Sequence, residues 1–196
     1  MAATPPPSSG DAAITKHLTL LLLHDADNDR LLLGLKKRGF GAGKLNGFGG
    51  KVEKGETILA AALREMREES GLCVEPASAA ALVGHLSFDF AGSREHLSVH
   101  VFRAPAAAAV GTLAESEEMA PQWVRASAPP YARMWKDDEH WLPLLLAGKR
   151  FVGSFSFQGG ELLRHTLAEV DALPAHLGDA HAVLVLHTQT PLTPQG

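Results

Sequence analysis

Three glutamates in one short segment, Glu65, Glu68 and Glu69, are the side chains with the clearest potential for chemistry. They lie in residues 57–70, a stretch without Pro or Gly that is dominated by good helix formers and is followed by Gly71, a residue suited to ending a helix. At about 100° per residue, the three carboxylates fall within roughly 100° of one another on that helix. Because carboxylates so close repel one another, we expect a positive group among them.

A hard divalent cation is one candidate for that positive group. Mg²⁺ prefers oxygen ligands and is usually held by one or two carboxylates together with substrate phosphates. The alternative is a solvated charged face with pairs such as Arg64 to Glu68, which is the favoured interpretation of a generic glutamate-rich helix. The spacing of the surrounding residues shifts the balance toward the cation.

The surrounding residues follow the pattern G-x5-E-x7-R-E-(apolar)-x-E-E-x-G-(apolar), from Gly50 to Leu72. Its seven fixed identities have a chance probability on the order of 10⁻⁹ to 10⁻⁸ per start position at average composition. This pattern is the signature of the Nudix hydrolases, which the chain resembles. The resemblance implies a loop–helix–loop that binds Mg²⁺, with Mn²⁺ as a substitute, and that hydrolyses a nucleoside diphosphate joined to another group.

Roles for individual residues follow from this resemblance. The implied metal ligands are Glu65, Glu68 and Glu69, with the backbone at Gly49 nearby and Glu118 reaching the site from a loop. We expect Glu69 to orient or deprotonate the attacking water, with Glu118 as its rival, so the catalytic set comprises the same four glutamates. The residues with implied structural roles are Glu56, Arg64 and Gly71.

A second, more extensive match involves LLLGLKKRGFGAGKLNGFGGKVEKGETI, SEEMAPQWV, MWKDDEHWLPLLL and FSFQG. These segments resemble the eukaryotic MutT-type branch of the family, which acts on oxidised purine nucleoside triphosphates. The resemblance implies that Asn46, Asp137 and Asp138 read the base and that Trp135 and Phe88 stack on it. The other implied substrate-binding residues are Thr19, Lys36, Phe40, Phe48, Gly49, Gly50, Lys51, Leu97, Lys136 and Trp141.

The adjacent pair Asp137 and Asp138 has a further implication if it is partly buried beside Trp135. Two such carboxyl groups cannot both ionise easily, so one should have a raised pKa and the pair should share a proton. A protonated carboxyl donates and an ionised one accepts, and the two can exchange roles. We therefore predict that one pocket takes both an oxidised guanine and an oxidised adenine. The alternative is that the two aspartates cap the helix that follows.

The chain departs from the MutT-type branch at two positions. Leu45 stands beside the base-reading Asn46 where we expect Trp, and Leu97 stands where we expect Met. Both changes keep the site apolar, so they bear on the ranking of purines more than on the reaction.

The elements that must position these residues are mostly strands. Periodicity and turn residues predict strands at 17–24, 30–36, 82–90, 96–104, 121–125 and 150–157, and a second helix at 139–147 that contains Pro143. Periodicity leaves 161–170 undecided, and the resemblance favours a strand there. Residues 75–81 and 105–114 are interpreted as connections. This mixture predicts an α/β protein, and the resemblance implies the Nudix fold, an α/β/α sandwich with a central mixed β-sheet.

Length and composition bound the partners of this protein. The 196 residues suit one sizeable core, and a net charge of −4 argues against a nucleic-acid polymer as partner. Positive charge is concentrated within residues 36–51, which suits a small polyanion. No apolar run reaches the ~18 residues of a membrane span. We expect a monomer that binds a small nucleotide, with no nucleic-acid polymer and no membrane as partners.

The chain divides into three parts at this level. We expect a disordered leader at 1–15, a Nudix hydrolase domain at 16–171, and a C-terminal extension at 172–196 in which 182–187 could add an edge strand. The single Cys73 excludes an intrachain disulfide and agrees with a reducing compartment. The expected location is therefore the cytoplasm, with the nucleus or mitochondria as further compartments.

The expected reaction is Mg²⁺-dependent hydrolysis of 8-oxo-dGTP and 2-hydroxy-dATP to the monophosphate and pyrophosphate. Such a reaction removes mutagenic precursors from the nucleotide pool. The nearest alternative is a Nudix hydrolase for a dinucleoside polyphosphate, ADP-ribose or an RNA cap. A catalytically silent Nudix binding module is a third reading, but such a module should have lost a helix glutamate, and this chain has all three.

Overall fold

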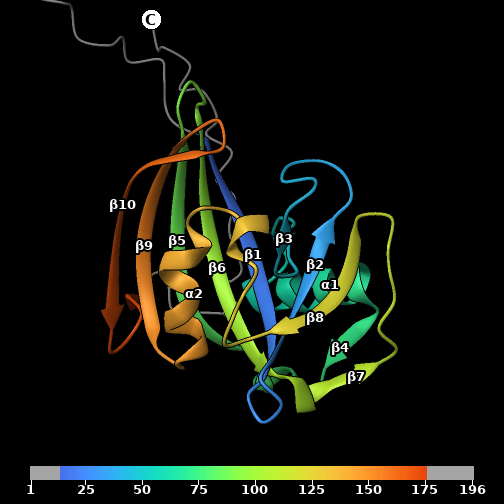
Figure 1. Ribbon diagram of the computed structural model, residues 1–196. Coiled ribbons are helices and arrows are strands. Elements are labelled where there is room, and N and C mark those ends of the chain that lie inside the picture. Colours follow the sequence, from blue (N-terminus) through green and yellow to red (C-terminus); the bar gives the residue numbers. More distant parts are fainter. Residues whose placement is uncertain (1–13, 176–196) are drawn as a thin grey trace, which may run out of the picture.

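The computed structural model describes residues 14–175 (Figure 1). Residues 1–13 of the expected leader and most of the C-terminal extension, including the proposed edge strand at 182–187, lie outside the described residues, whereas residues 14 and 15 of that leader belong to the first strand. Within the described range, no helix is long and apolar enough to cross a membrane.

A mixed sheet of eight strands forms the centre of the described chain. Neighbouring strands are parallel in two places, β1 with β6 and β5 with β9, and antiparallel in the others. The strands, in spatial order, are β10 (Glu161–Val170), β9 (Arg150–Gln158), β5 (Ala81–Phe90), β6 (Glu95–Pro105), β1 (Ile14–Asp25), β2 (Arg30–Lys36) and β3 (Leu45–Asn46), while β8 (Met119–Arg125) also pairs with β2. The prediction of a mixed central sheet is confirmed.

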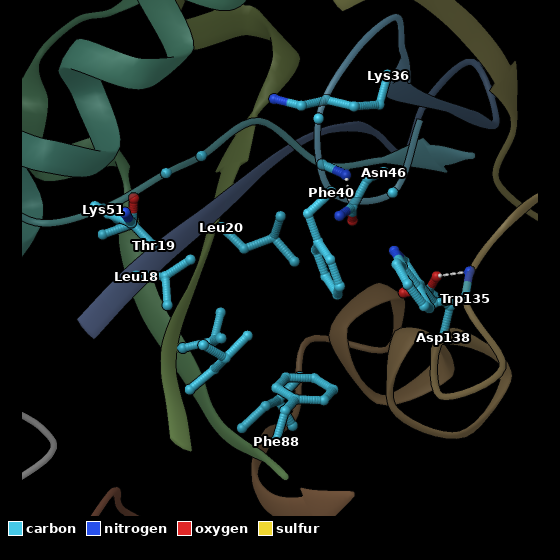
Figure 2. Close-up of a pocket in the computed structure, with 18 of the residues that line it drawn as sticks. Leu18, Thr19, Leu20, Lys36, Phe40, Asn46, Lys51, Phe88, Trp135 and Asp138 are labelled. Carbon is cyan, nitrogen blue, oxygen red and sulfur yellow. Dashed lines mark hydrogen bonds between the residues drawn. The ribbon is translucent and has the colours of Figure 1, made fainter. Parts of the chain in front are cut away.

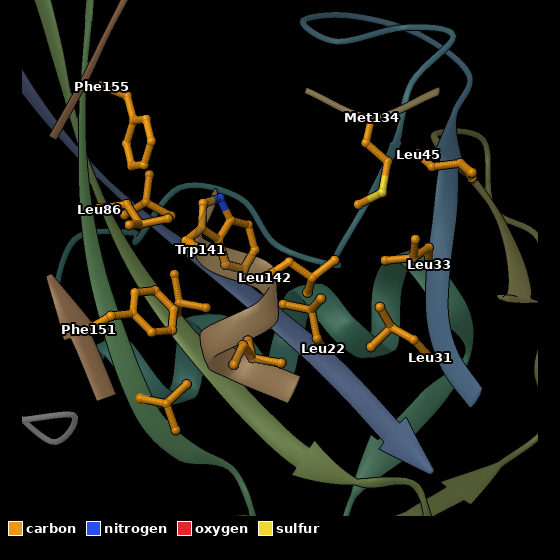
Figure 3. Packing of buried hydrophobic residues seen from close by; sticks show 14 of the residues in the cluster. Leu22, Leu31, Leu33, Leu45, Leu86, Met134, Trp141, Leu142, Phe151 and Phe155 are labelled. Carbon is orange, nitrogen blue, oxygen red and sulfur yellow. The ribbon is translucent and has the colours of Figure 1, made fainter. Parts of the chain in front are cut away.

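The two faces of this sheet are covered by different helices. Alternating leucines on β1 place Leu22 on one face and Leu21 and Leu23 on the other. Helix α1 (Ile58–Ser70) packs over the second face, and α2 (Asp138–Leu146) packs over the first, where Trp141 and Leu142 meet Phe151 and the β2 leucines (Figures 1 and 3). The arrangement is the predicted α/β/α sandwich.

Helix α1 begins and ends where its capping residues stand. The Thr57 hydroxyl accepts a hydrogen bond from the Ala60 N–H at 3.0 Å. At the other end, Gly71 adopts a left-handed conformation with φ 75°, and its N–H donates to the carbonyl of Arg67. These two ends fix which residues of the helix face the sheet and which remain at its side.

Three short strands, β3, β4 and β7, were not predicted. Strand β4 (Leu72–Val74) follows α1 directly and pairs with β7 (Ala109–Gly111), within the segment interpreted as a connection. Three-residue strands carry too little periodicity to be recognised in a sequence. The interpretation of residues 105–114 as a simple connection is therefore wrong.

A split between β1 and β2 is the feature of the fold that builds the site. The two strands pair directly only near their hairpin, from Leu23 to Leu32 outward to the turn. Beyond that point, β3 and residues 47–51 lie between them, and Leu21 exchanges two backbone hydrogen bonds with Phe48, at 2.7 and 3.0 Å. Residues 47–51 are thus held inside the sheet rather than at its surface.

Candidate active site

Two consecutive glycines bring backbone against the acidic helix. A Cβ atom on Gly49 would lie 1.9 Å from the carbonyl oxygen of Thr19, and one on Gly50 would lie 2.3 Å from Oε1 of Glu65. Neither position has room for a side chain. The closeness allows the Gly49 N–H to donate to Oε2 of Glu69 at 2.9 Å.

Substitution of Gly49 tests this close approach. Gly49→Ala must push the loop away from the backbone of Thr19, which cannot yield as a side chain could. We expect the free energy of unfolding to fall by about 2 kcal/mol or more and hydrolysis to fall about 100-fold, because the Glu69 carboxylate loses its hydrogen-bond donor. Urea unfolding and steady-state kinetics measure the two effects.

The matched control for this substitution is Gly160→Ala. A Cβ atom at Gly160 would meet nothing within 4 Å, so both stability and turnover should stay near those of the unsubstituted protein. Equal behaviour of the two alanine variants would contradict the role given to Gly49.

Arg64 organises one half of the acidic cluster. Its guanidinium donates to both oxygens of Glu56, at 2.9 and 3.1 Å, and to Glu65 at 2.9 Å and Glu68 at 3.2 Å. It also donates to the carbonyl of Lys51, which ties the loop to the helix. The hydrogen bond from Arg64 lowers the pKa of Glu56, so this carboxylate stays ionised.

Lys36 organises the other half. Its ammonium group lies 3.2 Å from Oε1 of Glu69 and 2.9 Å from Oε2 of Glu118. Arg38 also contacts Glu118, at 3.0 Å, and the hydrogen bonds from the two cations lower the pKa of that carboxyl. Burial would lower the pKa of Lys36, but its hydrogen bonds to Glu118 and Glu69 outweigh burial and raise the pKa. The positive groups predicted among the glutamates are thus, in this conformation, two side chains of the protein itself.

The same glutamates differ in their exposure. Glu69 is 4% exposed, and burial raises its pKa in spite of the hydrogen bond from Gly49. Glu65 is half-buried, and burial raises its pKa as well. Buried carboxylates stacked on one side of a helix gain from a cation that joins them.

A polar cavity of about 720 Å³ lies beside α1 and is lined by Glu65, Glu68, Glu69 and Glu118 together with the backbone of Gly49 and Gly50. Within residues 14–175, no three His, Cys, Asp or Glu side chains are close enough together to hold a metal ion without moving. The donor set is nevertheless made only of oxygens, with room provided by the absent side chain of Gly50. These residues therefore fit a hard divalent cation such as Mg²⁺.

A second cavity, of about 490 Å³, opens from the split between β1 and β2 (Figure 2). It is mainly apolar, as base-binding pockets usually are. Of the predicted substrate residues, those that line it are Thr19, Lys36, Phe40, Asn46, Gly49, Gly50, Lys51, Phe88, Leu97, Trp135, Asp137, Asp138 and Trp141. The two cavities share six residues, namely Lys36, Gly49, Gly50, Lys51, Glu69 and Glu118, so they meet at the loop and at the buried end of the acidic cluster.

Two predicted substrate residues lie elsewhere. Phe48 is fully buried against α1, where it packs with Met66 and Met119. Its side chain faces the opposite side of the sheet from the cavity. Lys136 is exposed and does not line the cavity. Neither side chain therefore lies where it could contact a ligand in this cavity. Leu45, the residue where a Trp was expected, is buried in the core near Leu33 and Met134 rather than in the cavity (Figure 3).

Aromatic rings form the walls of the apolar cavity. Phe40 stacks on Trp135 with ring centroids 5.0 Å apart and an interplanar angle of 21°, and it meets Phe90 edge-on at 5.5 Å. Phe88 stacks on Phe155 at 5.6 Å. Figure 2 shows the Phe40 ring lying between Leu20 and Trp135.

Several lining residues were missed from the sequence: Leu18, Leu20, Arg38, Phe90, Met119 and Phe157. For Phe157, the alternation of aromatic residues along β9 was an available signal. Leu18 and Leu20 could have been found from the predicted strand, since they alternate with Thr19.

Thr19 has an unusual environment for a buried hydroxyl. Its side chain is 3% exposed, and among residues 14–175 its Oγ1 atom has no hydrogen-bond partner. Buried hydroxyls almost always have a partner. A ligand in the adjacent cavity could supply one.

The two aspartates lie at the inner end of the same cavity. Oδ2 of Asp138 accepts the backbone N–H of Trp135 at 2.8 Å, and Oδ2 of Asp137 accepts the indole N–H of Trp141 at 2.9 Å. Asp137 occupies the N-cap position of α2, but its side chain makes no capping hydrogen bond within the described residues. The capping alternative therefore lacks support.

Burial dominates the electrostatics of this pair. Asp137 is 4% exposed, and its burial raises its pKa to about 6. Asp138 is 2% exposed, and burial together with the charge of Asp137 raises its pKa well above the usual range. With one proton on the pair, one carboxyl donates and the other accepts.

The fold and the site together define a class of protein, an α/β/α sandwich in which an acidic loop–helix–loop meets an apolar, aspartate-lined cavity. The family model of the NUDIX domain matches residues 16–145. The chain therefore belongs to the Nudix family of hydrolases. Members of this family generally use a divalent metal ion such as Mg²⁺ and act on small-molecule nucleotides.

Individual relatives cover most of the chain. A mouse (Mus musculus) protein named oxidized purine nucleoside triphosphate hydrolase is 53% identical over 144 residues, which are 73% of this chain and 89% of that protein. A zebrafish (Danio rerio) protein of the same name is 50% identical over 160 residues, 81% of this chain and 98% of that protein. The crystal structure of the MutT protein from Bacillus halodurans has a TM-score of 0.67 at 26% identity, over 78% of this chain and 97% of that one.

Proposed function

We propose that this protein hydrolyses oxidised purine nucleoside triphosphates, with 8-oxo-dGTP and 2-hydroxy-dATP as substrates, to the monophosphate and pyrophosphate. In this role it removes damaged precursors from the nucleotide pool before they enter DNA. The names of the mouse and zebrafish relatives support the substrate class. The observation that carries the proposal is the junction of the two cavities, where six residues line both the apolar cavity that contains the aspartates and the polar cavity beside α1.

The base end of the substrate is assigned to the aspartates. A purine edge presents adjacent donors and acceptors, and a carboxyl–carboxylate pair can meet either order by moving one proton. We assign the contact to the Oδ1 atoms of Asp137 and Asp138, since each Oδ2 atom accepts an indole or backbone N–H. Apolar rings around them exclude water, which strengthens the discrimination.

The triphosphate end is assigned to the shared residues. Lys36 and Lys51 supply positive charge, and the Gly49–Gly50 backbone allows phosphate oxygens to approach closely. Phosphates arriving at Lys36 compete with its ion pairs to Glu69 and Glu118, so substrate binding frees carboxylate oxygens. We assign Mg²⁺ to Glu65, Glu68, Glu69 and Glu118.

When bound there, Mg²⁺ supplies positive charge to the phosphates and acidifies the attacking water. Glu69 is the side chain placed to orient that water and accept its proton, because it lies at the junction and the Gly49 N–H fixes its second oxygen. Glu118 is 46% exposed at its side chain and is held by both Lys36 and Arg38, which makes it the weaker candidate. The water attacks phosphorus in line with the leaving pyrophosphate or monophosphate, and Lys36 offsets charge on the phosphate oxygens.

A substrate panel tests the function as a whole. Pyrophosphate release is followed from 8-oxo-dGTP, 2-hydroxy-dATP and dGTP, and nucleoside monophosphate release is followed in parallel from a dinucleoside polyphosphate and ADP-ribose. We expect kcat/KM for both oxidised nucleotides to exceed that for dGTP by about 10-fold or more, because a mismatched base leaves a buried carboxyl unpaired. Fastest turnover of the dinucleoside polyphosphate or ADP-ribose would contradict the proposal.

A further inference from the structure

Lys44 lies directly behind the aromatic wall of the base cavity. Its ammonium group is 5.0 Å from the centroid of the Trp135 ring and donates to the carbonyl of Met134 at 3.2 Å. Trp135 lines the cavity, whereas Lys44 is absent from the lining. Any effect of Lys44 on a bound base must therefore pass through its neighbours.

The backbone around Lys44 is held firmly in this position. Its N–H donates to the carbonyl of Gly41 at 3.0 Å, and its carbonyl accepts the N–H of Lys36 at 2.9 Å. Gly41 itself lies against the indole, since a Cβ atom there would be 3.3 Å from Nε1 of Trp135. The loop thus presents Lys44 and Gly41 to the same indole that stacks on Phe40.

The charge of Lys44 acts on the aspartate pair as well. Burial raises the pKa of both carboxyl groups, and among the described residues Lys44 is the cation whose charge lowers the pKa of each. The groups that donate hydrogen bonds to the pair are neutral, namely the backbone N–H of Trp135, the indole N–H of Trp141 and the backbone N–H of Asp137 itself. Burial, together with the charges of Asp138 and Glu139, raises the pKa of Tyr131, so its phenol stays neutral beside the pair.

We propose that Lys44 is a positioning residue for base selectivity, which fixes Trp135 as one wall of the slot and holds the aspartate pair at a single negative charge. This inference rests on the proposed function, because it concerns how the same cavity reads an oxidised purine. With one negative charge, the pair offers one donor and one acceptor. With no negative charge the pair offers two donors, and with two negative charges it offers only acceptors. Either state matches a purine edge less well.

Two substitutions separate the charge of Lys44 from its contacts. Lys44→Gln keeps a hydrogen-bond donor for the Met134 carbonyl but removes the positive charge. Lys44→Arg keeps the donor and the positive charge. Lys149→Met is the charge control, because Lys149, just before β9, does not line the cavity and pairs with Glu169 of β10. Each variant is assayed for kcat/KM from pH 5 to pH 10 with 8-oxo-dGTP and 2-hydroxy-dATP, and its melting temperature is measured to confirm folding.

We expect the alkaline limb of the pH profile to move to higher pH in Lys44→Gln, by about one pH unit. Loss of a neighbouring positive charge raises the carboxyl pKa values, so the pair loses its last proton at higher pH. Lys44→Arg should restore the original limb, and Lys149→Met should leave it unmoved. The inhibition constant of tripolyphosphate, which probes the phosphate end alone, should be the same in all variants.

A uniform loss of activity in Lys44→Gln with unmoved limbs, or failure of Lys44→Arg to restore the profile, would overturn the inference and leave Lys44 a structural residue. If the unsubstituted protein does not hydrolyse either oxidised nucleotide, the proposed function itself fails. The two failures are therefore distinguishable within one experiment.

Discussion

Glu69→Gln should lower kcat by about 100-fold to 10,000-fold while leaving the fold intact. The amide keeps the shape of the side chain, and its oxygen can still accept the Gly49 N–H that now binds Oε2. It cannot take a proton from water or bind a cation as a carboxylate does. Magnesium-dependent pyrophosphate release from 8-oxo-dGTP measures the loss, and the melting temperature should change by only a few degrees.

Glu118→Gln is the comparison that separates the two candidate bases. Its carboxylate lies on a loop and is bound by two cations, so we expect a smaller loss of kcat than in Glu69→Gln. Near-normal turnover of Glu69→Gln would exclude Glu69 as the base. A larger loss in the Glu118 variant would transfer the role to that residue.

Asp137→Asn and Asp138→Asn should each lower kcat/KM for oxidised purines by about 10-fold to 100-fold, since an amide cannot exchange donor and acceptor roles by moving a proton. The loss should differ between 8-oxo-dGTP and 2-hydroxy-dATP, because each variant fixes the pair in one pattern. Kinetics with both nucleotides measure the difference. If neither substitution changes turnover of either substrate, the base-reading role is wrong.

The same substitutions should stabilise the folded protein at neutral pH. A carboxyl group whose pKa is raised on folding lowers the stability of the folded protein at pH values above its unfolded-state pKa, and this cost grows until the pH reaches the folded-state pKa. For Asp137 the window runs from about 4 up to about 6. We expect the melting temperature of each asparagine variant to exceed that of the unsubstituted protein at pH 7.5 by about 2–4 °C per kcal/mol gained.

The stability difference should shrink toward pH 4, where the carboxyl groups of the folded protein are protonated. Equal melting temperatures at pH 7.5 would contradict the assignment of an ionised charge to this buried pair. If the asparagine substitutions raise stability and lower activity together, the aspartates serve function at the expense of stability.

Much of the fold was predictable because its signals are local. Helix α1 has both of its caps and a run of helix formers in one short stretch, and β2 is bounded by turn residues on both sides. Strand β10 was undecided on periodicity because it lies at the edge of the sheet, where only part of its residues are covered. The pairing of β4 with β7 joins segments far apart in the sequence and leaves no local trace.

The candidate site was predicted in part, and by resemblance rather than by geometry. The roles of Glu69 and Asp138 could be inferred from the resemblance. The junction between their two cavities could not, because it results from the insertion of residues 45–51 between β1 and β2. Phe48 shows the limit of such transfer. It is a neighbour of cavity residues in the sequence, yet its side chain points to the opposite face of the sheet.

Phe40 is 67% exposed, yet its ring rests almost parallel on Trp135 at a centroid distance of 5.0 Å. No further ring fits between two planes at that separation, so a nucleobase that uses this face of the indole must displace the phenyl group. In this conformation the phenyl ring occupies the position that a stacked base would take. The dissociation constant of a nucleotide that stacks on this face of Trp135 therefore reflects the free energy of the base–indole stack minus that of the Phe40–indole stack. It understates the free energy of the base–indole stack itself.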